Sequence, residues 1–411
     1  MSFQQGLSGL NVAAKNLDVI GNNVANSSTV GFKASQAQFV DVYAASLGGG
    51  GSLQAGIGTK VSTIAQQFTQ GNISVTNNPL DVAINGKGFF RMDQQGTVYY
   101  SRSGQFQLDK DGFIVNASGE NLTGYDANST GTILPGALVN LQLSSADIAP
   151  AATANADILV NMDSRASIIP AATAFDMNNP ATYNSSTSMT VLDSLGNEQN
   201  YTLYFKKTAA NTWEVYTSLS NAVGSAATAQ GLLTTVTFNT SGAITSGASA
   251  SETLSAGDLG TGAAALTFTL DLTGSTQFGS PFGVNSITQD GYASGRLTGF
   301  SIGSDGIVQA RYSNGQNVAQ GQVVLGNFTN PQGLQPLGNG LFAETATSGQ
   351  PAVGAPGSGS LGVLQASATE DSTVDLTAEL VNMITAQRVY QANAQSIKTQ
   401  DQVLQTLVNL R

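Results

Sequence analysis

Apolar residues near both ends of the chain recur at intervals of three, four and seven, which predicts an amphipathic helix at each terminus. Such seams are typical of helices that pair as a coiled coil. The N-terminal seam consists of Phe3, Leu7, Leu10, Leu17 and Val24. The C-terminal seam consists of Leu376, Leu380, Met383, Tyr390, Ile397, Leu404 and Val408.

The C-terminal stretch reads as one long helix because neither Gly nor Pro follows Gly362. Ser372 is predicted to cap this helix, with Asp375 three residues further on. A helix with two apolar faces cannot bury both against one partner helix, so the pattern favours contacts beyond a simple helical hairpin. The second apolar row consists of Val381, Ile384, Val403, Leu407 and Leu410.

Between the two ends the pattern changes to a period of two, which predicts β-strands. Hairpin turns are expected where Asp-Gly, Ser-Gly or Asn-Gly separates alternating apolar residues: at 111–112, 118–119, 305–306 and 314–315. Further strands are predicted in the middle of the chain, in the segments SMTVLD, YTLYFKK, TWEVYTSL, TTVTFN and LTFTLDL.

Charge narrows the possible partners. Charged residues make up only 10% of the chain, the formal net charge is −11, and Lys and Arg form no cluster. A nucleic-acid partner is therefore not expected, because phosphates need a basic surface. The block 146–284 holds ten acidic and three basic residues, whereas 1–35 and 371–411 are nearly neutral. We expect solvent around the middle block and packed copies around the termini.

The N-terminal residues lack the basic and apolar regions of a general secretory signal. No apolar run reaches the roughly 20 residues needed to span a bilayer. We therefore expect no membrane insertion, and a protein that is either cytosolic or exported by an unconventional route.

Catalytic chemistry is poorly represented. With no Cys and no His, Ser-His-Asp triads, Cys-His dyads and ordinary zinc sites are excluded. Gly86-Lys87 lacks the remaining residues of a phosphate loop, and the run from Asp109 lacks the later ligands of a calcium loop. A carboxylate pair for glycoside hydrolysis stays open, but the single Trp, Trp213, is expected in the core. We expect no catalytic residue, no metal and no cofactor.

Four stretches resemble the rod-and-hook family of bacterial flagellar axial proteins. They are GLSGLNVAAKNLDVIGNNVANSSTVGFK, PLDVAINGKGFF, SRSGQFQLDKDGFIVNASGENLTGY and VDLTAELVNMITAQRVYQANAQSIKTQDQVLQTLVNLR, the last of which is similar to the closing helix of the hook members. No comparable motif marks 146–284. The motif residues are Asn22, Asn23, Ala25, Asn26, Gly31, Phe32, Asp81, Gly86, Gly88 and Phe89.

These motif residues have expected structural roles. Asn tolerates turn geometry, so Asn22, Asn23 and Asn26 are expected to end the first helix through local hydrogen bonds. The segment from Asp81 to Gly88 is expected to shape a turn that leads Phe89 into the core.

Pattern and resemblance together predict a mainly β chain in which paired terminal helices enclose nested, antiparallel β domains. The expected parts are a helical coiled-coil domain (1–30 and 371–411), linkers (31–71 and 358–370), an inner β domain (72–145 and 285–357) and an outer β domain (146–284).

The resemblance implies a structural subunit of the flagellar hook, not an enzyme. Copies would polymerise into a curved hollow tube that acts as a universal joint and as an export channel. The implied partners are further copies, the distal rod, the hook cap, the hook–filament junction protein and the flagellar type III export apparatus. The implied location is the extracellular flagellum, reached without a cleaved signal peptide.

Two alternatives remain open at this point. A distal rod subunit of the same family would share these signatures, although rod subunits are usually much shorter. A secreted β-sandwich adhesin or glycosidase belongs to a different class and would show a cleft lined with aromatic residues and carboxylates.

Overall fold

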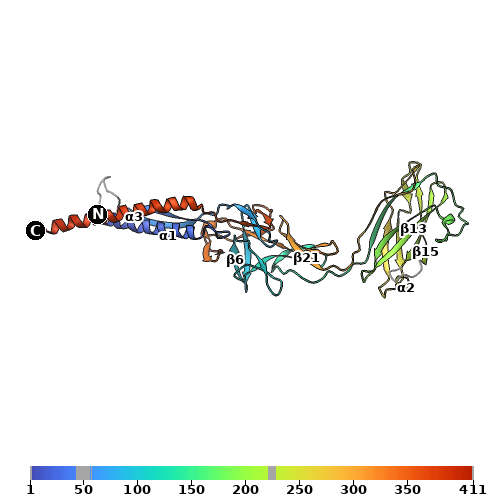
Figure 1. Ribbon diagram of the computed structural model, residues 1–411, viewed down its shortest axis with the longest axis horizontal. Coiled ribbons are helices and arrows are strands. Elements are labelled where there is room, and N and C mark those ends of the chain that lie inside the picture. Colours follow the sequence, from blue (N-terminus) through green and yellow to red (C-terminus); the bar gives the residue numbers. More distant parts are fainter. Residues whose placement is uncertain (1, 43–55, 57, 221–227, 410–411) are drawn as a thin grey trace. The chain divides into compact units, whose positions relative to one another are not determined.

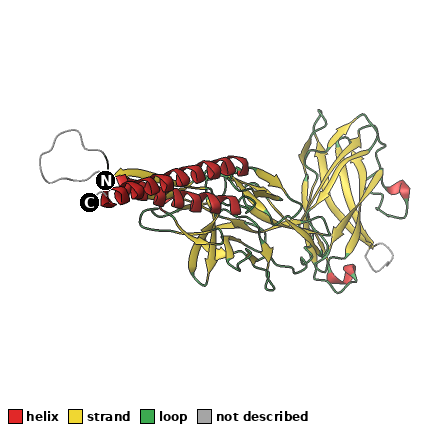
Figure 2. Ribbon diagram, turned by 60° about the vertical axis from the view of Figure 1, so that its left-hand side comes forward, coloured by secondary structure: helices red, strands yellow, loops and turns green. Residues whose placement is uncertain are grey.

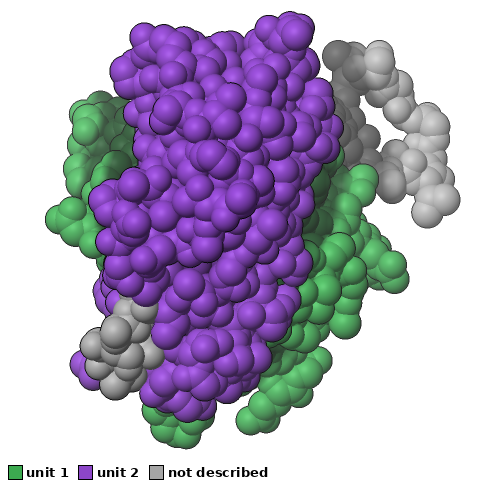
Figure 3. Space-filling model, turned by 90° about the vertical axis from the view of Figure 1, so that its right-hand side faces the viewer, with its two compact units in different colours: residues 1–145, 299–311, 317–411 green, residues 146–298, 312–316 purple. Residues whose placement is uncertain are grey.

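The computed structural model describes residues 2–42, 56, 58–220 and 228–409. The chain divides into two compact units, which Figure 3 shows in separate colours. Unit 1 comprises Met1–Ser145, Gly299–Arg311 and Asn317–Arg411. Unit 2 comprises Ala146–Thr298 and Tyr312–Gln316.

The two ends of the chain form long helices that pack against each other in unit 1. Helix α1 spans Ser2–Ala25 and α3 spans Leu376–Asn409, and they lie side by side in Figures 1 and 2. The predicted pairing of terminal helices is therefore confirmed.

Helix α3 begins later than the sequence indicated. The Asp375 carboxylate accepts hydrogen bonds from the backbone N–H groups of Thr377 and Ala378, at 2.9 and 3.1 Å. Asp375 is thus the residue that caps the helix. The prediction of Ser372 as the cap was wrong, because its hydroxyl accepts only from Val374 N.

The segments predicted as linkers contain strands. In the first, β1 (Ser35–Val42) and β2 (Gly58–Gln66) form an antiparallel pair that packs on α1. In the second, β28 (Val363–Ala366) pairs with β4 (Val82–Asn85), and β29 (Ala368–Glu370) pairs with β3 (Ile73–Val75). The described residues of both segments therefore belong to unit 1 and contribute strands to it.

A 13-stranded sheet forms the rest of unit 1. Its first strands come from the N-terminal half: β5 (Phe89–Gln94), β6 (Thr97–Ser101), β7 (Gln107–Leu108), β8 (Ile114–Val115), β9 (Asn121–Ala127) and β10 (Ile133–Asn140). The others follow unit 2: β21 (Leu297–Ile302), β22 (Ile307–Tyr312), β23 (Asn317–Val323), β24 (Leu325–Asn327), β25 (Gln335–Gly338), β26 (Leu341–Ala343) and β27 (Ala352–Gly354).

Two apolar clusters cover the two sides of this sheet. Adjacent strand residues point to opposite faces, and accordingly Phe89 belongs to one cluster and Phe90 to the other. Phe90 packs with Met92, Leu122 and other aliphatic residues. The expected burial of Phe89 is confirmed, since its side chain is 4% exposed.

Unit 2 is built from two five-stranded sheets and the short helix α2 (Ala256–Leu259). One sheet contains β12 (Ser185–Leu192), β13 (Glu198–Ala209), β14 (Thr212–Ser220), β15 (Thr228–Phe238) and β16 (Ile244–Ser246). The other contains β11 (Asn155–Asp163), β17 (Ser249–Leu254), β18 (Leu266–Asp271), β19 (Thr276–Phe278) and β20 (Gly283–Gln289).

One continuous core fills unit 2 and joins residues from both sheets, as in a β-sandwich. Trp213 is 1% exposed and donates its indole N–H to Gln277 Oε1 at 3.0 Å. The sequence prediction that this residue packs in a core is confirmed. The strands predicted in the middle block also appear, as β12, β13, β14, β15 and β18.

Hairpin turns lie where the sequence predicted them, with Gly112, Gly119, Gly306 and Gly315 all in the left-handed region. The end of the middle block differs, however. The expected boundary after residue 284 falls inside β20, which pairs with β11, and unit 2 continues to Thr298.

Candidate functional site

Small residues let α1 and α3 approach closely. A Cβ atom added at Gly6 would lie 3.1 Å from Ile397 Cγ1, and one added at Gly9 would lie 2.9 Å from Asn393 Nδ2. Ala13, seven residues after Gly6, is buried as well. In this part of the contact α1 therefore approaches α3 through small residues.

The large apolar residues of the predicted N-terminal seam lie mostly outside this contact. Phe3 and Leu7 are 45% and 43% exposed, and Leu10, Leu17 and Val24 are half-buried. In the single chain these side chains remain available to other molecules.

The predicted C-terminal seam is divided in the same way. Met383 and Ile397 are half-buried, and Ile397 is in close contact with Gly6. The side chain of Val408 lies outside the described residues. The exposed members of the seam are Leu376, Leu380, Tyr390 and Leu404.

The Asn-rich end of α1 makes both local and distant hydrogen bonds. Asn26 Nδ2 donates to the backbone oxygen of Asn22 at 2.9 Å, a local contact of the expected kind. Asn23 is buried instead: its amide donates to Ser35 O at 2.8 Å and to Glu379 Oε1 at 3.1 Å. Asn23 thus joins the end of α1 to both β1 and α3. Ala25, the last residue of α1, is exposed.

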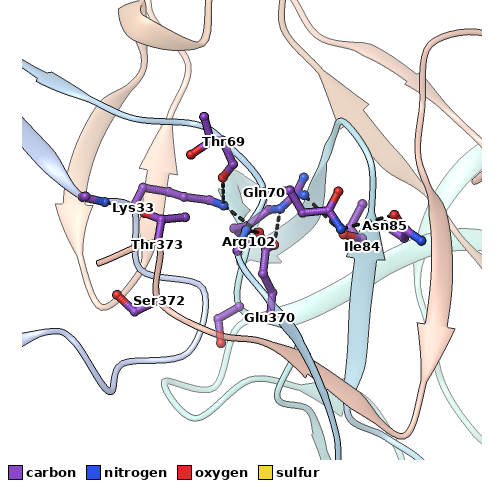
Figure 4. A network of polar contacts seen from close by, with 12 residues as sticks. Lys33, Thr69, Gln70, Ile84, Asn85, Arg102, Glu370, Ser372 and Thr373 are labelled. Carbon is purple, nitrogen blue, oxygen red and sulfur yellow. Dashed lines mark hydrogen bonds and ion pairs between the residues drawn. The ribbon is translucent and has the colours of Figure 1, made fainter. Parts of the chain in front are cut away.

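A buried ion cluster ties the helix ends to the β-sheet of unit 1 (Figure 4). We call Lys33, Arg102 and Glu370 the junction network. Glu370 Oε1 accepts from Lys33 Nζ at 2.7 Å, and Glu370 Oε2 accepts from Arg102 Nε at 2.5 Å. The three side chains are at most 6% exposed. Glu370 Oε1 also accepts from Gly71 N at 2.7 Å, so one carboxylate joins three distant segments.

Arg102 extends this network into the 81–89 motif. Its guanidinium donates to the backbone oxygens of Ile84, Gly86 and Gly88. Gly86 and Gly88 have φ values of 118° and 123°, which L side chains rarely adopt. The glycines of the motif therefore present a row of carbonyl oxygens to one arginine.

Electrostatics in the network are set by burial. Burial lowers the pKa of the Lys33 ammonium, and the ion pair with Glu370 opposes this effect. Two cations share one carboxylate, and backbone oxygens, including Thr69 O at 2.6 Å from Lys33 Nζ, complete the hydrogen bonding. The arrangement holds segments together and leaves no free base or nucleophile.

The remaining motif residues also fix the backbone. Asp81 accepts from Thr76 Oγ1 and Asn78 Nδ2, at 2.8 and 3.0 Å, and so shapes the turn before β4. Gly31, with φ of 71°, donates from its backbone N–H to Glu370 O at 2.7 Å. Phe32 O accepts from Thr373 N at 3.1 Å. The first motif segment is therefore bound to the residues that lead into α3.

Glu370 was not among the site residues predicted from the sequence. Arg102 lay within one of the four stretches that resemble the family, but no role was predicted for it. Neither follows from periodicity, because the contact joins residues separated by 268 positions. The usable signal is weak: charged residues make up only 10% of the chain, so each buried one needs a specific partner, but the sequence does not show which ones are buried.

In the described part of the chain, no group of three or more acidic residues is placed to hold a metal ion. Within the same residues, no helix is both long enough and apolar enough to cross a membrane.

Family models match the chain in consecutive segments. Residues 3–33 match "Flagella basal body rod protein", and residues 83–162 match "Flagellar hook protein FlgE/F/G D1 domain". Residues 161–292 match "Flagellar basal body protein FlaE D2 domain", and 365–410 match "Flagellar basal body rod FlgEFG protein C-terminal". The flagellar hook protein FlgE of Escherichia coli is 45% identical over 417 residues, with both chains covered completely. The chain belongs to the flagellar hook protein family.

Other relatives extend this family likeness. The hook protein of Salmonella typhimurium is 45% identical over 417 residues, and that of Rhizobium meliloti is 32% identical over 419 residues. These alignments cover all of this chain and 100% and 98% of the relatives. The crystal structure of Helicobacter pylori flagellar hook protein FlgE2 has a TM-score of 0.54 at 15% identity. It covers 71% of this chain and 99% of its own, which shows a shared fold.

The hook protein family is a family of structural proteins of the flagellum. Its models include the residues of the junction network: Lys33 in the first segment, Arg102 in the second and Glu370 in the last. The middle block carries no motif recognised from the sequence, but a family model of its own matches residues 161–292.

Proposed function

We infer that this chain is a structural subunit of the bacterial flagellar hook. The observation that carries this inference is the alignment of the whole chain, middle block included, with hook proteins at 45% identity.

We propose further that copies polymerise into a curved hollow tube that transmits torque from rod to filament and serves as an export channel. The support is the set of large apolar side chains left exposed on the terminal helices, including Phe3, Leu7, Leu380 and Leu404. A row of this kind indicates an interaction surface. Contacts between identical subunits that do not close into a ring produce an open helical polymer.

The proposed roles of the domains follow the sequence prediction. The paired helices are the polymerisation domain, the sheet of unit 1 is an inner β domain, and unit 2 is an outer β domain. We propose the seam residues as the polymerisation contacts. We propose that the motif residues 22–32 and 81–89 hold the helices on the β domain, because both groups contact the junction network.

The proposed partners, besides further copies, are the distal rod, the hook cap, the hook–filament junction protein and the flagellar type III export apparatus. The proposed location is the extracellular flagellum, reached without a cleaved signal peptide. We propose that the chain has no enzymatic activity, binds no cofactor and does not contact nucleic acid.

The distal rod alternative is not favoured, because hook proteins cover the full length of this chain, including 161–292. The adhesin or glycosidase alternative is not favoured either, because full-length relatives are hook proteins and Trp213 is buried in a core.

Immunogold electron microscopy of flagella from the native cells tests this function. Antibodies against this chain should label curved hollow tubes between the rod and the filament. Label confined to the rod would favour the rod alternative, and label on the cell surface away from flagella would favour an adhesin. Either result would overturn the proposal.

A further inference from the structure

A groove of about 770 Å³ lies between α1, α3 and the β1–β2 pair. Apolar side chains from all of these elements line it, among them Val12, Ala13, Ile20, Ala37 and Val389. Protein interiors are packed with few voids larger than a water molecule. Half of the twenty lining residues are polar, Asn16, Thr385 and Asn393 among them, so the groove has an apolar part and a polar part. The described residues of the single chain leave this groove unfilled.

Among the described residues that line the groove, Glu379 is the only charged one. Its Oε1 accepts from Asn23 Nδ2, but its Oε2 is buried and has no hydrogen-bond partner among the described residues. Buried carboxylate oxygens are normally satisfied. The groove thus contains an acceptor that still lacks a donor.

The opposite face of α3 carries features that complement the groove. Val381 and Ile384 are 58% and 53% exposed. Arg388 is exposed and has no ion pair within the described residues. It follows Glu379 by nine residues, about two and a half turns of an α-helix, so Arg388 and Glu379 lie on opposite faces of α3.

We propose that the groove receives helix α3 of a second copy, with Val381 and Ile384 in its apolar part and Arg388 beside Glu379. Rotation of the Glu379 carboxylate toward the groove supplies a charge-assisted hydrogen bond between the copies. The inference rests on the proposed function, because it specifies a contact within the hook polymer.

The geometry of this contact suits an open polymer. The groove and the inserted face lie on opposite sides of the same helix, so each copy can accept one neighbour and be accepted by another. Such a heterologous contact repeats without closing between two molecules.

Charge distinguishes this occupant from the exposed row of α1. Phe3, Leu7 and Leu10 are also available, but they present no cation between them. A partner that buries Glu379 without a counter-charge would leave an unpaired buried carboxylate. The α3 face supplies both the apolar ridge and the cation.

A charge exchange tests the ionic part of the contact. Cells that produce only Glu379→Arg or only Arg388→Glu should yield fewer hooks by about tenfold or more, because each leaves like charges facing each other. The double variant restores opposite charges and should recover most of the yield. Lys398→Glu, which changes an exposed cation elsewhere on α3, is the matched control and should assemble normally.

Failure of the double variant to recover hooks, although circular dichroism shows its helices intact, would contradict the proposal. Normal assembly of both single variants would contradict it as well. Glu379→Gln keeps the acceptor for Asn23 and isolates the loss of charge from any loss of folding.

Cysteine cross-linking tests the position of the second copy, and the absence of native Cys removes any background. Hooks made from Asn16→Cys/Ile384→Cys chains should give a ladder of covalent multimers after oxidation. Asn16 lines the groove. Asp18→Cys/Ile384→Cys is the control, since Asp18 is exposed and is not among the residues that line the groove, and it should give no ladder.

Two outcomes would overturn the inference while the hook function stands. A ladder from Leu7→Cys/Asn16→Cys instead would show that α1 occupies the groove. Normal tubes with no ladder from either pair would show that no second copy enters it. Failure of the unmodified chain to form tubes in these cells would instead contradict the proposed function itself.

Discussion

At the scale of single residues, Glu370 concentrates most of the cohesion between the helix ends and the β-sheet. Its two carboxylate oxygens accept from Lys33, Gly71 and Arg102, and its backbone oxygen accepts from Gly31. Removing one partner of a buried ionic cluster is far more costly than replacing the whole cluster with apolar residues, because the remaining charges stay desolvated.

We expect Glu370→Gln to lower the free energy of unfolding of unit 1 by about 3–5 kcal/mol, because Lys33 and Arg102 lose their only carboxylate partner in the network. Chemical denaturation of the monomer, followed by far-UV circular dichroism, measures the change. Asp371→Asn is the matched control, since its carboxylate contacts only the hydroxyl of Ser74 and the amide of Asn72. Equal effects of the two variants would refute the special role of Glu370.

Unit 2 contains a residue whose protonation links stability to pH. Burial would raise the pKa of the Asp193 carboxyl, but hydrogen bonds from Thr261, Asn197 and Leu195 outweigh burial and hold this pKa below its usual value of 3.8. The unfolded chain therefore binds the proton at higher pH than the folded chain. The contribution of Asp193 to stability is complete above pH 3.8 and is lost as the pH falls through the folded pKa.

Asp193→Asn should accordingly lower the unfolding free energy of unit 2 at about pH 7, and the difference from the unmodified protein should shrink at about pH 2. Fluorescence of Trp213, the single Trp, reports on this core. Asp157→Asn, a change at an exposed carboxylate on β11, is the control. A difference that stays constant with pH would contradict this assignment.

At the scale of elements, the helix pair depends on residues that hydrophobic patterning passes over. Hydrophobic periodicity singles out large apolar side chains, whereas α1 approaches α3 closely at Gly6 and Gly9. A glycine inside a helix lowers the stability of that helix. Its presence at a helix contact therefore indicates that close approach of the two backbones matters more there than helix propensity.

Gly9→Val should weaken the helix pair, because a branched side chain would occupy the space of the Asn393 amide, which lies 2.9 Å from the position of a Cβ atom. Gly21→Ala is the matched change: no atom lies within 4 Å of its Cβ position, and alanine should stabilise α1 by about 0.5–1 kcal/mol. The resistance of α3 to protease in the monomer measures the effect of both substitutions. Equal resistance of the two variants would refute the close contact at Gly9.

Sequence patterns predicted the local elements well. The terminal helices, the glycine turns and the strand that carries Trp213 follow from nearest-neighbour chemistry, since period and turn type are local properties. Ser372 and Asp375 both satisfy the local rule for a helix cap, and only the three-dimensional path of the chain decides between them.

Long-range contacts were beyond the reach of the same patterns. The strand nature of 363–370 depends on partners near residues 73–85, and the role of Glu370 depends on Lys33 and Arg102. Neither pairing leaves a periodic trace, because each joins single positions that are about 270 to 340 residues apart.

At the scale of the whole molecule, each unit has its own apolar core. Unit 2 is inserted into unit 1 and contains no part of the terminal helices. We propose that the terminal helices in unit 1 carry assembly and that unit 2 modulates the polymer.

Leu380→Asp should leave the monomer folded, because Leu380 is 45% exposed there. It should block polymerisation, because the same carboxylate would be buried unpaired in every subunit contact, at a cost of several kcal/mol each. Sedimentation of the polymer and circular dichroism of the monomer measure the two effects. Thr377→Asp, a change at an exposed polar position one turn earlier, is the control, and normal tubes from Leu380→Asp would remove this residue from the contact.

Excision of 146–298, bridged by a short Gly-Ser linker, should leave unit 1 folded and still able to form a tube, but a straighter or mechanically altered one. The reason is that the core of unit 1 contains no residue from the excised range. Electron microscopy of hooks from cells that produce only this variant gives the answer. Complete loss of polymer, with unit 1 folded, would assign assembly to unit 2.

The short strands that precede α3 have a mechanical consequence. Besides the contact with α1, α3 is tied to the β strands of unit 1 through residues 363–370, which form four register pairs with β4 and three with β3. Beside them, Glu370 adds three hydrogen bonds through its side chain. Because these contacts are few, we expect them to be among the first to open when torque is applied repeatedly to α3.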